Sequence, residues 1–295
     1  MPRKKRNWSQ YNRKLVNRGR ISFWIDKDLA KNPFDEQRGK GRPRFSDAFL
    51  IAALCLRCVY SLSLRSLEGF LTDLMLLLGV DSPVPHYTLF SKRMKNLSLP
   101  QLSSRRPMHL LVDASGVKVL GEGEWKVKIH GKSSRRKWIK LHVSIDEKSQ
   151  EVVAVKVTNS NVSDSAVLEE LLDDGPKTAK KLSADGAYDG LPSRKVLYDR
   201  GIEGVIPPPN NAVFRKEREM SFRNKFLEVW KCFGGDETAK SITKKFFGYH
   251  RRSLVETTFS RLKKLFGCRF QSQTWENLCT EARLKFWTLN RMMAA

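Results

Sequence analysis

Apolar residues between positions 46 and 97 recur at helical intervals and predict three helices. The first is expected over 48–60 and the second over roughly 64–77. A proline-containing break at 81–85 then separates them from a third helix, which starts at 87 or 88 and ends near 96. The pattern therefore predicts an all-helical module in the N-terminal part of the chain.

From position 106 onward the pattern changes to short strands and helices. Apolar residues at 139, 141, 143 and 145 alternate with Lys140, His142 and Ser144, which is typical of a half-buried strand. Three strands followed by alternating helices and strands predict a mixed α/β domain. The expected elements are strands 110–113, 139–145 and 152–157, helix 163–172, strand 182–185, helix 192–200 and strand 204–206.

Residues 209–248 combine basic and aromatic side chains, and we expect a mostly helical insertion with a break at Gly234 and Gly235. Such a mixture is typical of a surface that grips DNA, although a helix with buried rings and outward lysines has the same pattern. A last helix over 277–293 is expected to pack on the core or on a second subunit. The predicted division is 1–45, a basic arm; 46–100, the helical module; 106–208 with 249–270, the α/β core; 209–248, the insertion; and 271–295, the C-terminal helix.

The charge of the chain narrows the class of partner. Among 295 residues, 55 are Lys or Arg and 31 are Asp or Glu, so the formal net charge is +24. A positive surplus of this size indicates that the binding partner is a polyanion, since phosphate contacts supply most non-specific affinity for nucleic acid. The longest apolar runs are too short to span a bilayer, and no secretory segment follows the basic start. We therefore expect a DNA-binding protein of the cytoplasm, associated with the nucleoid when bound, and no membrane partner.

Two basic regions are candidates for DNA contact. Residues 1–20 contain many cations and no acid, a composition typical of a disordered nucleic-acid-binding arm, although its aromatic residues favour packing. The third predicted helix carries Lys92, Arg93 and Lys95. This layout suits a helix-turn-helix whose last helix enters the major groove. An ordinary three-helix packing domain is the alternative.

Cysteine and histidine chemistry finds little support. Cys55 and Cys58 have C-x-x-C spacing, but they lie in an apolar helical run without a second pair, so we expect buried small side chains rather than zinc ligands. No serine or cysteine nucleophile motif is evident. The histidines have no zinc-ligand spacing within one helix; they are His86, His109, His130, His142 and His250.

Carboxylates in three separate segments suggest metal chemistry instead. Asp113 and Asp185 each follow a β-prone run and precede a glycine, and Glu256 lies 71 residues after Asp185. If the third segment is helical, one face presents Glu256 among hydroxyl and cationic groups, namely Tyr249, Arg252 and Lys263. Oxygen ligands suit Mg²⁺ or Mn²⁺, and three carboxylates are what two-metal phosphoryl transfer requires. A single Asp-Gly pair is more simply a turn or helix cap.

Three blocks carry a family resemblance. The first comprises 113–116, Gly121–Trp125 and Arg136–His142, and the second comprises Asp185–Asp189 followed by Val205–Pro208. The third has tyrosine, two residues, arginine, three residues, glutamate, six residues and lysine, from Tyr249 to Lys263. In this order the blocks resemble those of IS5-family insertion-sequence transposases, closest to the IS903-like branch. The similarity extends from about Arg42 to the 289–292 ending.

This resemblance implies a DDE transposase with a ribonuclease-H-like catalytic core, in which Asp113 and Asp185 stand on neighbouring strands. By carry-over, Asp113, Asp185 and Glu256 are the catalytic and metal-binding triad for two Mg²⁺ or Mn²⁺ ions. Tyr249, Arg252 and Lys263 support DNA at the site. Ala114 departs from the family, whose members often have serine there, so a hydroxyl role at that position is lost.

The resemblance further implies binding of terminal inverted repeats, metal-dependent cleavage, and strand transfer by the freed 3′-hydroxyl into target DNA. Pairing two transposon ends requires at least a homodimer. Two alternatives remain open at this stage. One is a DNA-binding regulator derived from a transposase, and the other is a metal-dependent nuclease with a ribonuclease-H-like core.

Overall fold

The computed structural model describes residues 7–35, 43–103, 106–119 and 138–294. The start of the basic arm, His130, and the Gly121–Trp125 and Arg136–Lys137 parts of the first sequence block lie outside the described residues. The chain divides into two compact units. The first comprises 1–101, 264–267 and 271–295, and the second comprises 102–263 and 268–270.

The first unit is helical, as the apolar pattern predicts. The three expected helices are α3 (Asp47–Tyr60), α4 (Leu64–Leu77) and α5 (Tyr87–Met94). Ser46 and Ser63 cap α3 and α4 by accepting hydrogen bonds from backbone N–H groups of the first turn. Cys55 and Cys58 are buried free thiols, and burial raises their pKa values to about 12 and about 11. Both were expected to be buried side chains.

The basic arm is more ordered than its charge pattern indicates. It contains α1 (Trp8–Arg18) and α2 (Lys27–Lys31), and the Trp24 side chain between them is 2% exposed. Arg18 Nε donates to the carbonyl of Met292 at 2.7 Å, and the Arg291 guanidinium lies 5.7 Å from the Trp24 ring. Residues 8–18 are helical although none of them is buried, whereas the burial of Trp24 and Ile25 packs the segment that follows, so the described part of the arm has more structure than its charge indicates.

The last helix, α12 (Trp275–Ala294), belongs to the first unit. It packs against α3 and α5, and the Thr280 hydroxyl donates to the carbonyl of Met94 at 2.9 Å. Among the described residues, no single helix is long and apolar enough to cross a membrane. Only α3 and α4 together, bent by 110°, reach that length and composition.

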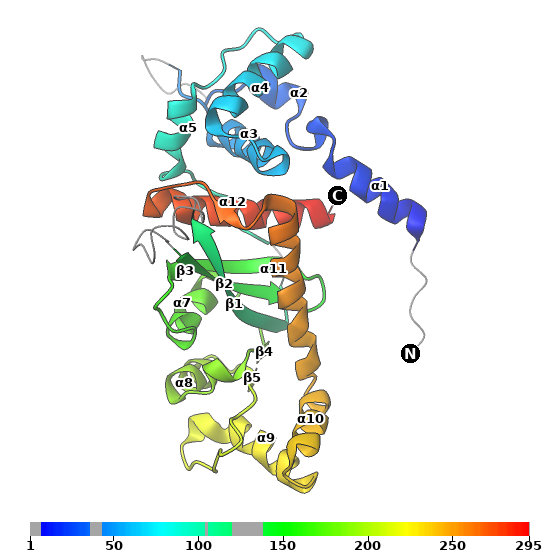
Figure 1. The fold of residues 1–295 in the computed structure, drawn as a ribbon, viewed down its shortest axis with the longest axis vertical. Coiled ribbons are helices and arrows are strands. Elements are labelled where there is room, and N and C mark those ends of the chain that lie inside the picture. Colours follow the sequence, from blue (N-terminus) through cyan, green and yellow to red (C-terminus); the bar gives the residue numbers. More distant parts are fainter. Residues whose placement is uncertain (1–6, 36–42, 104–105, 120–137, 295) are drawn as a thin grey trace, which may run out of the picture. The chain divides into compact units, whose positions relative to one another are not determined.

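The second unit is built on a mixed sheet with strand order β3-β2-β1-β4-β5, and β6 (Arg269–Phe270) pairs with β1 (Figure 1). β1 (His109–Val119), β2 (Trp138–Asp146) and β3 (Val152–Asn159) are antiparallel neighbours. β4 (Lys181–Ser183) and β5 (Glu203–Val205) run parallel to β1. The predicted mixed α/β domain is confirmed, and β1 and β4 are neighbours as expected.

Helices cover both faces of this sheet. Leu110 and Val112 of β1 join a buried cluster with residues of α7 (Leu168–Asp174) and α8 (Leu191–Asp199). On the opposite face Lys263 of α11 (Ser253–Phe266) donates to Ser115 of β1 at 2.9 Å. His142 and Ser144 are consequently buried, so the prediction of a half-buried second strand is wrong. Alternation fails there because both sides of the strand face protein.

The insertion is helical, as predicted. It contains α9 (Ser221–Cys232) and α10 (Glu237–Phe246), which break at Gly234 and Gly235, both with positive φ. Phe226 packs in a small cluster with Val205 and Phe247, so α9 is attached to the end of β5. The insertion thus packs on the edge of the sheet.

Candidate active site

The sheet register brings two of the predicted carboxylates to the same place. β1 and β4 pair through Leu111 and Ser183, and Asp113 and Asp185 each follow two residues later. The sequence suggests that the strand ends at Asp113. In the structure it does not, because β1 continues to pair with β2 as far as Lys118. Asp185 does follow the end of β4, and its Oδ1 accepts a hydrogen bond from Ala187 N at 2.9 Å.

The third segment reaches these carboxylates from the end of α10. Gly248, with φ of 75°, turns the chain into a short 3₁₀ helix, η5 (Tyr249–Arg252), which leads into α11. Tyr249 and Arg252 therefore precede the α-helix, and the single α-helical face predicted for all four residues is wrong for these two. Lys181 Nζ of β4 donates to the carbonyl of Phe247 at 2.8 Å and holds the segment beside the sheet.

Arg252 connects two of the three carboxylates. Its Nη1 donates to Asp113 Oδ2 at 2.8 Å, and its Nη2 donates to Glu256 Oε1 at 2.6 Å. Asp113 and Arg252 have side chains only 16% and 18% exposed, whereas Glu256 is 57% exposed. The guanidinium lies 5.9 Å from the centre of the Tyr249 ring. One cation thus neutralises a partly buried carboxylate and an open one.

The electrostatics place Asp185 in the same neighbourhood. Burial is the largest influence on Asp113 and raises its pKa, and the charge of Asp185 raises it further against the opposing effect of Arg252. Burial likewise raises the pKa of the Tyr249 phenol, which also feels Arg252, Asp185 and Asp113. The structure therefore joins Asp113 and Glu256 through Arg252, and Asp185 is near enough to Asp113 for its charge to raise the pKa of that carboxyl.

The comparison with protein families gives this site its context. A model described as a transposase DDE domain matches residues 104–291, which contain all three carboxylates, and a second model with the same description matches residues 16–122. The chain belongs to the transposase DDE domain family.

Solved transposase structures are similar to this DDE-family chain at low identity. One is a piggyBac transposase synaptic complex with hairpin DNA, with 14% identity, 95% of this chain and 74% of that chain covered, and a TM-score of 0.42. Another is the Drosophila P element transposase strand transfer complex, with 11% identity, 96% and 71% covered, and a TM-score of 0.31. A third is the Mos1 transposase paired-end complex with the left transposon end, with 12% identity, 76% and 81% covered, and a TM-score of 0.24.

The donor chemistry of the site suits a hard divalent cation, since all three candidates are carboxylates. Within the part of the chain that the structure describes, however, no three Asp, Glu, His or Cys side chains are arranged to hold a metal ion. The Arg252 guanidinium contacts both Asp113 and Glu256. The residues therefore fit a metal in kind, and the position of cationic charge among them is taken by Arg252.

The candidate DNA contacts in the helical unit divide into two kinds. Lys92 and Lys95 are exposed, and Lys92 lines a hollow of about 570 Å³ with Arg44 and His86. Arg93 instead donates to Asp47 Oδ1 at 2.5 Å and to the carbonyl of Phe45, so it ties α5 to the start of α3. Arg93 was expected to contact DNA, and the structure gives its side chain a carboxylate and a carbonyl partner within the helical unit.

The connections that join α3, α4 and α5 differ in length, and the helix-turn-helix expected of these helices stays a prediction. α3 and α4 are joined by residues 61–63 and bent by 110°, whereas a longer loop leads from α4 to the basic helix α5. α4 carries Glu68 and Asp73 against the single cation Arg65, which does not favour a phosphate backbone. Turn geometry and positive charge thus belong to different helices.

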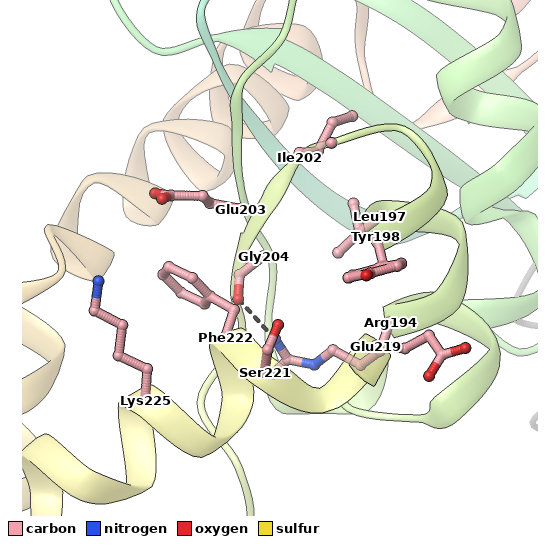
Figure 2. Close-up of a pocket in the computed structure, with 11 residues that line it drawn as sticks. Arg194, Leu197, Tyr198, Ile202, Glu203, Gly204, Glu219, Ser221, Phe222 and Lys225 are labelled. Carbon is pink, nitrogen blue, oxygen red and sulfur yellow. Dashed lines mark hydrogen bonds between the residues drawn. The ribbon is translucent and has the colours of Figure 1, made fainter. Parts of the chain in front are cut away.

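Sequence reasoning missed two groups of paired charges in the second unit, one partly buried and one buried. Lys140 Nζ donates to Asp164 Oδ1 at 2.9 Å, and His142 lies 3.8 Å from the same oxygen. Asp189, in the second block, binds two arginines. A cavity of about 350 Å³ between α8, β5 and α9 contains none of the three carboxylates (Figure 2). The only signal for the first group in the sequence was the polar residues inside strand 139–145.

Proposed function

We propose that this DDE-family transposase cleaves transposon ends and joins them to target DNA, with Asp113, Asp185 and Glu256 holding two divalent ions, Mg²⁺ or Mn²⁺. The observation that carries the proposal is that Asp113 and Glu256 meet at one guanidinium while Asp113 feels the charge of Asp185. The strand order and the helices on both faces of the sheet support a ribonuclease-H-like core.

Divalent ions at the triad would supply Lewis-acid activation of water or a 3′-hydroxyl and stabilisation of the leaving oxygen. The chain supplies the charge that binds and holds them. Asp113 is fixed through the hydrogen bond from Ala114 N, at 2.9 Å, and through its place in β1. Asp185 is fixed by the turn that it caps, and Glu256 projects from the first turn of α11. No histidine base is needed for this chemistry.

Arg252 connects this metal chemistry to DNA. The guanidinium can bind a phosphate as a two-pronged donor, so a DNA end that draws it away frees Asp113 and Glu256. Lys263 is held by Ser115 at 2.9 Å and, with the phenol of Tyr249, adds donors close to the triad. We therefore assign the phosphate-supporting role to Tyr249, Arg252 and Lys263, and further backbone contacts to Lys92 and Lys95.

The net charge of +24 supports DNA as the partner, in the form of terminal inverted repeats and target. Pairing two ends needs a homodimer or larger assembly. The spacing from Tyr249 to Lys263 supports a place among insertion-sequence transposases of the IS5 type. The same Arg252 contacts favour one second candidate, a DNA-binding regulator in which the arginine keeps the carboxylates neutralised.

The test uses purified protein, Mg²⁺ or Mn²⁺, a labelled transposon end and a plasmid target, scored for binding, nicking and joining. Asp113→Asn, Asp185→Asn and Glu256→Gln are each expected to abolish nicking and joining while end binding stays within about twofold. Binding without nicking by the unaltered chain would favour the regulator, and nicking without joining would favour a nuclease. A triad variant that joined ends at the rate of the unaltered chain would refute the assignment.

A further inference from the structure

A buried carboxylate four residues after Asp185 joins the core to the insertion. Asp189 Oδ1 accepts hydrogen bonds from Nε and Nη2 of Arg194, at 3.1 and 2.7 Å. Its Oδ2 accepts one from Nε of Arg223, at 3.0 Å. The side chains of Asp189 and Arg194 are 2% exposed, and that of Arg223 is 6% exposed. Both oxygens of one carboxylate are therefore held by separate guanidinium groups away from water.

Arg194 uses its remaining donors on the end of β5. Nη1 donates to the carbonyl of Gly204 at 2.7 Å, as the dashed line in Figure 2 shows, and Nη2 donates to that of Ile206 at 2.8 Å. Helix α8, the end of β5 and Asp189 thus form one fixed group. All of these contacts of Arg194 lie within the sheet domain, so this arginine does not involve the insertion.

Arg223 comes from the insertion. It is in the first turn of α9, and its Nη1 donates to the carbonyl of Val213 at 2.8 Å. The Val213 carbonyl holds the Arg223 side chain, and Arg223 in turn holds Asp189. Removing Arg223 would leave part of the buried charge of Asp189 uncompensated. The insertion is therefore a direct neighbour of the segment that follows β4.

Asp189 and Asp185 are the two ends of one short turn. Asp185 is the N-cap and Asp189 the C-cap of the 3₁₀ helix η3 (Gly186–Tyr188). Asp189 N donates to the carbonyl of Gly186 at 3.0 Å, and Tyr188 between them is 1% exposed in the hydrophobic core. A turn held at its core residue and at its C-cap leaves little freedom at its N-cap. Movement of Asp189 is consequently transmitted to Asp185.

We propose that Arg223 is a positioning residue for Asp185, so that the insertion sets the geometry of one carboxylate of the triad through Asp189. This inference rests on the proposed role of Asp185 as a metal ligand. Residues that orient a ligand carboxylate typically change metal affinity or activity about 10- to 100-fold when they are replaced. We therefore expect the effect of Arg223 to appear in the metal requirement and not in DNA binding.

The experiment compares full-length Arg223→Met with Lys225→Met, which removes one exposed cation from the same helix. The Mn²⁺ concentration for half-maximal nicking, the maximal nicking rate and the affinity for end DNA are measured for each. Mn²⁺ binding without DNA is followed by electron paramagnetic resonance. Arg223→Met should raise the half-saturating Mn²⁺ concentration about tenfold and weaken direct Mn²⁺ binding to match, whereas Lys225→Met leaves both unchanged.

Two further variants keep the result decisive. Arg223→Lys retains the charge but lacks the fork that reaches both Asp189 and Val213, so it should rescue folding and part of the Mn²⁺ affinity. If Arg223→Met does not fold, Arg223→Lys alone tests the proposal, and an unchanged half-saturating Mn²⁺ concentration in it overturns the positioning role. A folded Arg223→Met protein with unaltered Mn²⁺ binding does the same. Asp185→Asn separates the two hypotheses, since Mn²⁺ binding unaffected by it would refute the proposed function itself.

Discussion

Replacing Arg252 by glutamine should strengthen divalent-metal binding in the absence of DNA. The guanidinium donates to Asp113 at 2.8 Å and to Glu256 at 2.6 Å. A metal ion that takes these two carboxylates must displace both hydrogen bonds. Glutamine keeps a polar side chain at this position but carries no charge, so the competing cation is removed while the carboxylates remain.

The contact between Arg252 and Asp113 determines how large the gain in Mn²⁺ affinity should be. Both of its side chains are less than one-fifth exposed, and a hydrogen bond between charged groups in such a place contributes about 1.5–3 kcal/mol. Glu256 is 57% exposed, and solvent screening reduces its pair with Arg252 to about 0–1 kcal/mol. About 1.4 kcal/mol corresponds to a tenfold change in an equilibrium constant. Arg252→Gln is therefore expected to bind Mn²⁺ at least about tenfold more tightly.

The assay is Mn²⁺ binding to full-length protein without DNA, followed by electron paramagnetic resonance near pH 8. Arg252 is one of the groups that lower the pKa of Asp113, so every variant is compared with the unaltered chain at the same pH. Arg251→Gln is the matched control, since Arg251 lies in the same 3₁₀ turn but pairs with Glu147. The reasoning is refuted if folded Arg252→Gln binds Mn²⁺ no more tightly than the unaltered chain, or if Arg251→Gln gives the same gain.

Two further predictions concern the sheet. A Cβ at Gly204 would lie 2.6 Å from Leu197 Cδ1, so Gly204→Ala should lower the free energy of unfolding by about 1–3 kcal/mol in urea titrations. Adding Leu197→Ala should relieve part of that strain, and strictly additive losses would contradict this explanation. Burial and Lys181 lower the pKa of His109 to about 4, so its stabilising effect is present above the unfolded-state pKa and is lost as the pH falls through the folded-state value. Stability should fall by about 2 kcal/mol between pH 7 and pH 5 through this group, and an equal fall in His109→Gln over that interval would contradict the attribution to His109.

The helices of the first unit could be predicted closely because local signals define them. Ser63 caps α4, which begins and ends where the apolar pattern places it. The same kind of reasoning predicted an unbroken helix from Tyr249 and missed the turn at Gly248. Helical periodicity does not distinguish a 3₁₀ turn from the first turn of an α-helix, since both bring residues three apart close together.

The failures in the second unit have a different origin. Asp113 looked like the end of a strand because glycine follows shortly, but β1 continues through Gly116, which pairs with Lys140 of β2. His142 is buried where its ring nitrogens meet Thr158 of β3 and Asp164, which lie 16 and 22 residues later in the chain. Both features are set by tertiary neighbours, which a pattern along a single strand does not contain.

The role of the arginines shows why net charge alone is an incomplete guide to this chain. Arg93, Arg194 and Arg223 each bind a carboxylate and a backbone carbonyl within their own unit, and Arg194 and Arg223 are almost fully buried. They add to the formal surplus of +24, but each of their charges is already paired with a carboxylate. Lys92 and Lys225 are exposed, and under the proposed function such cations are the ones that supply salt-dependent affinity for DNA. Arg223 and Lys225 lie two residues apart on α9 with the same charge, yet one should control the metal requirement and the other only the salt dependence of DNA binding.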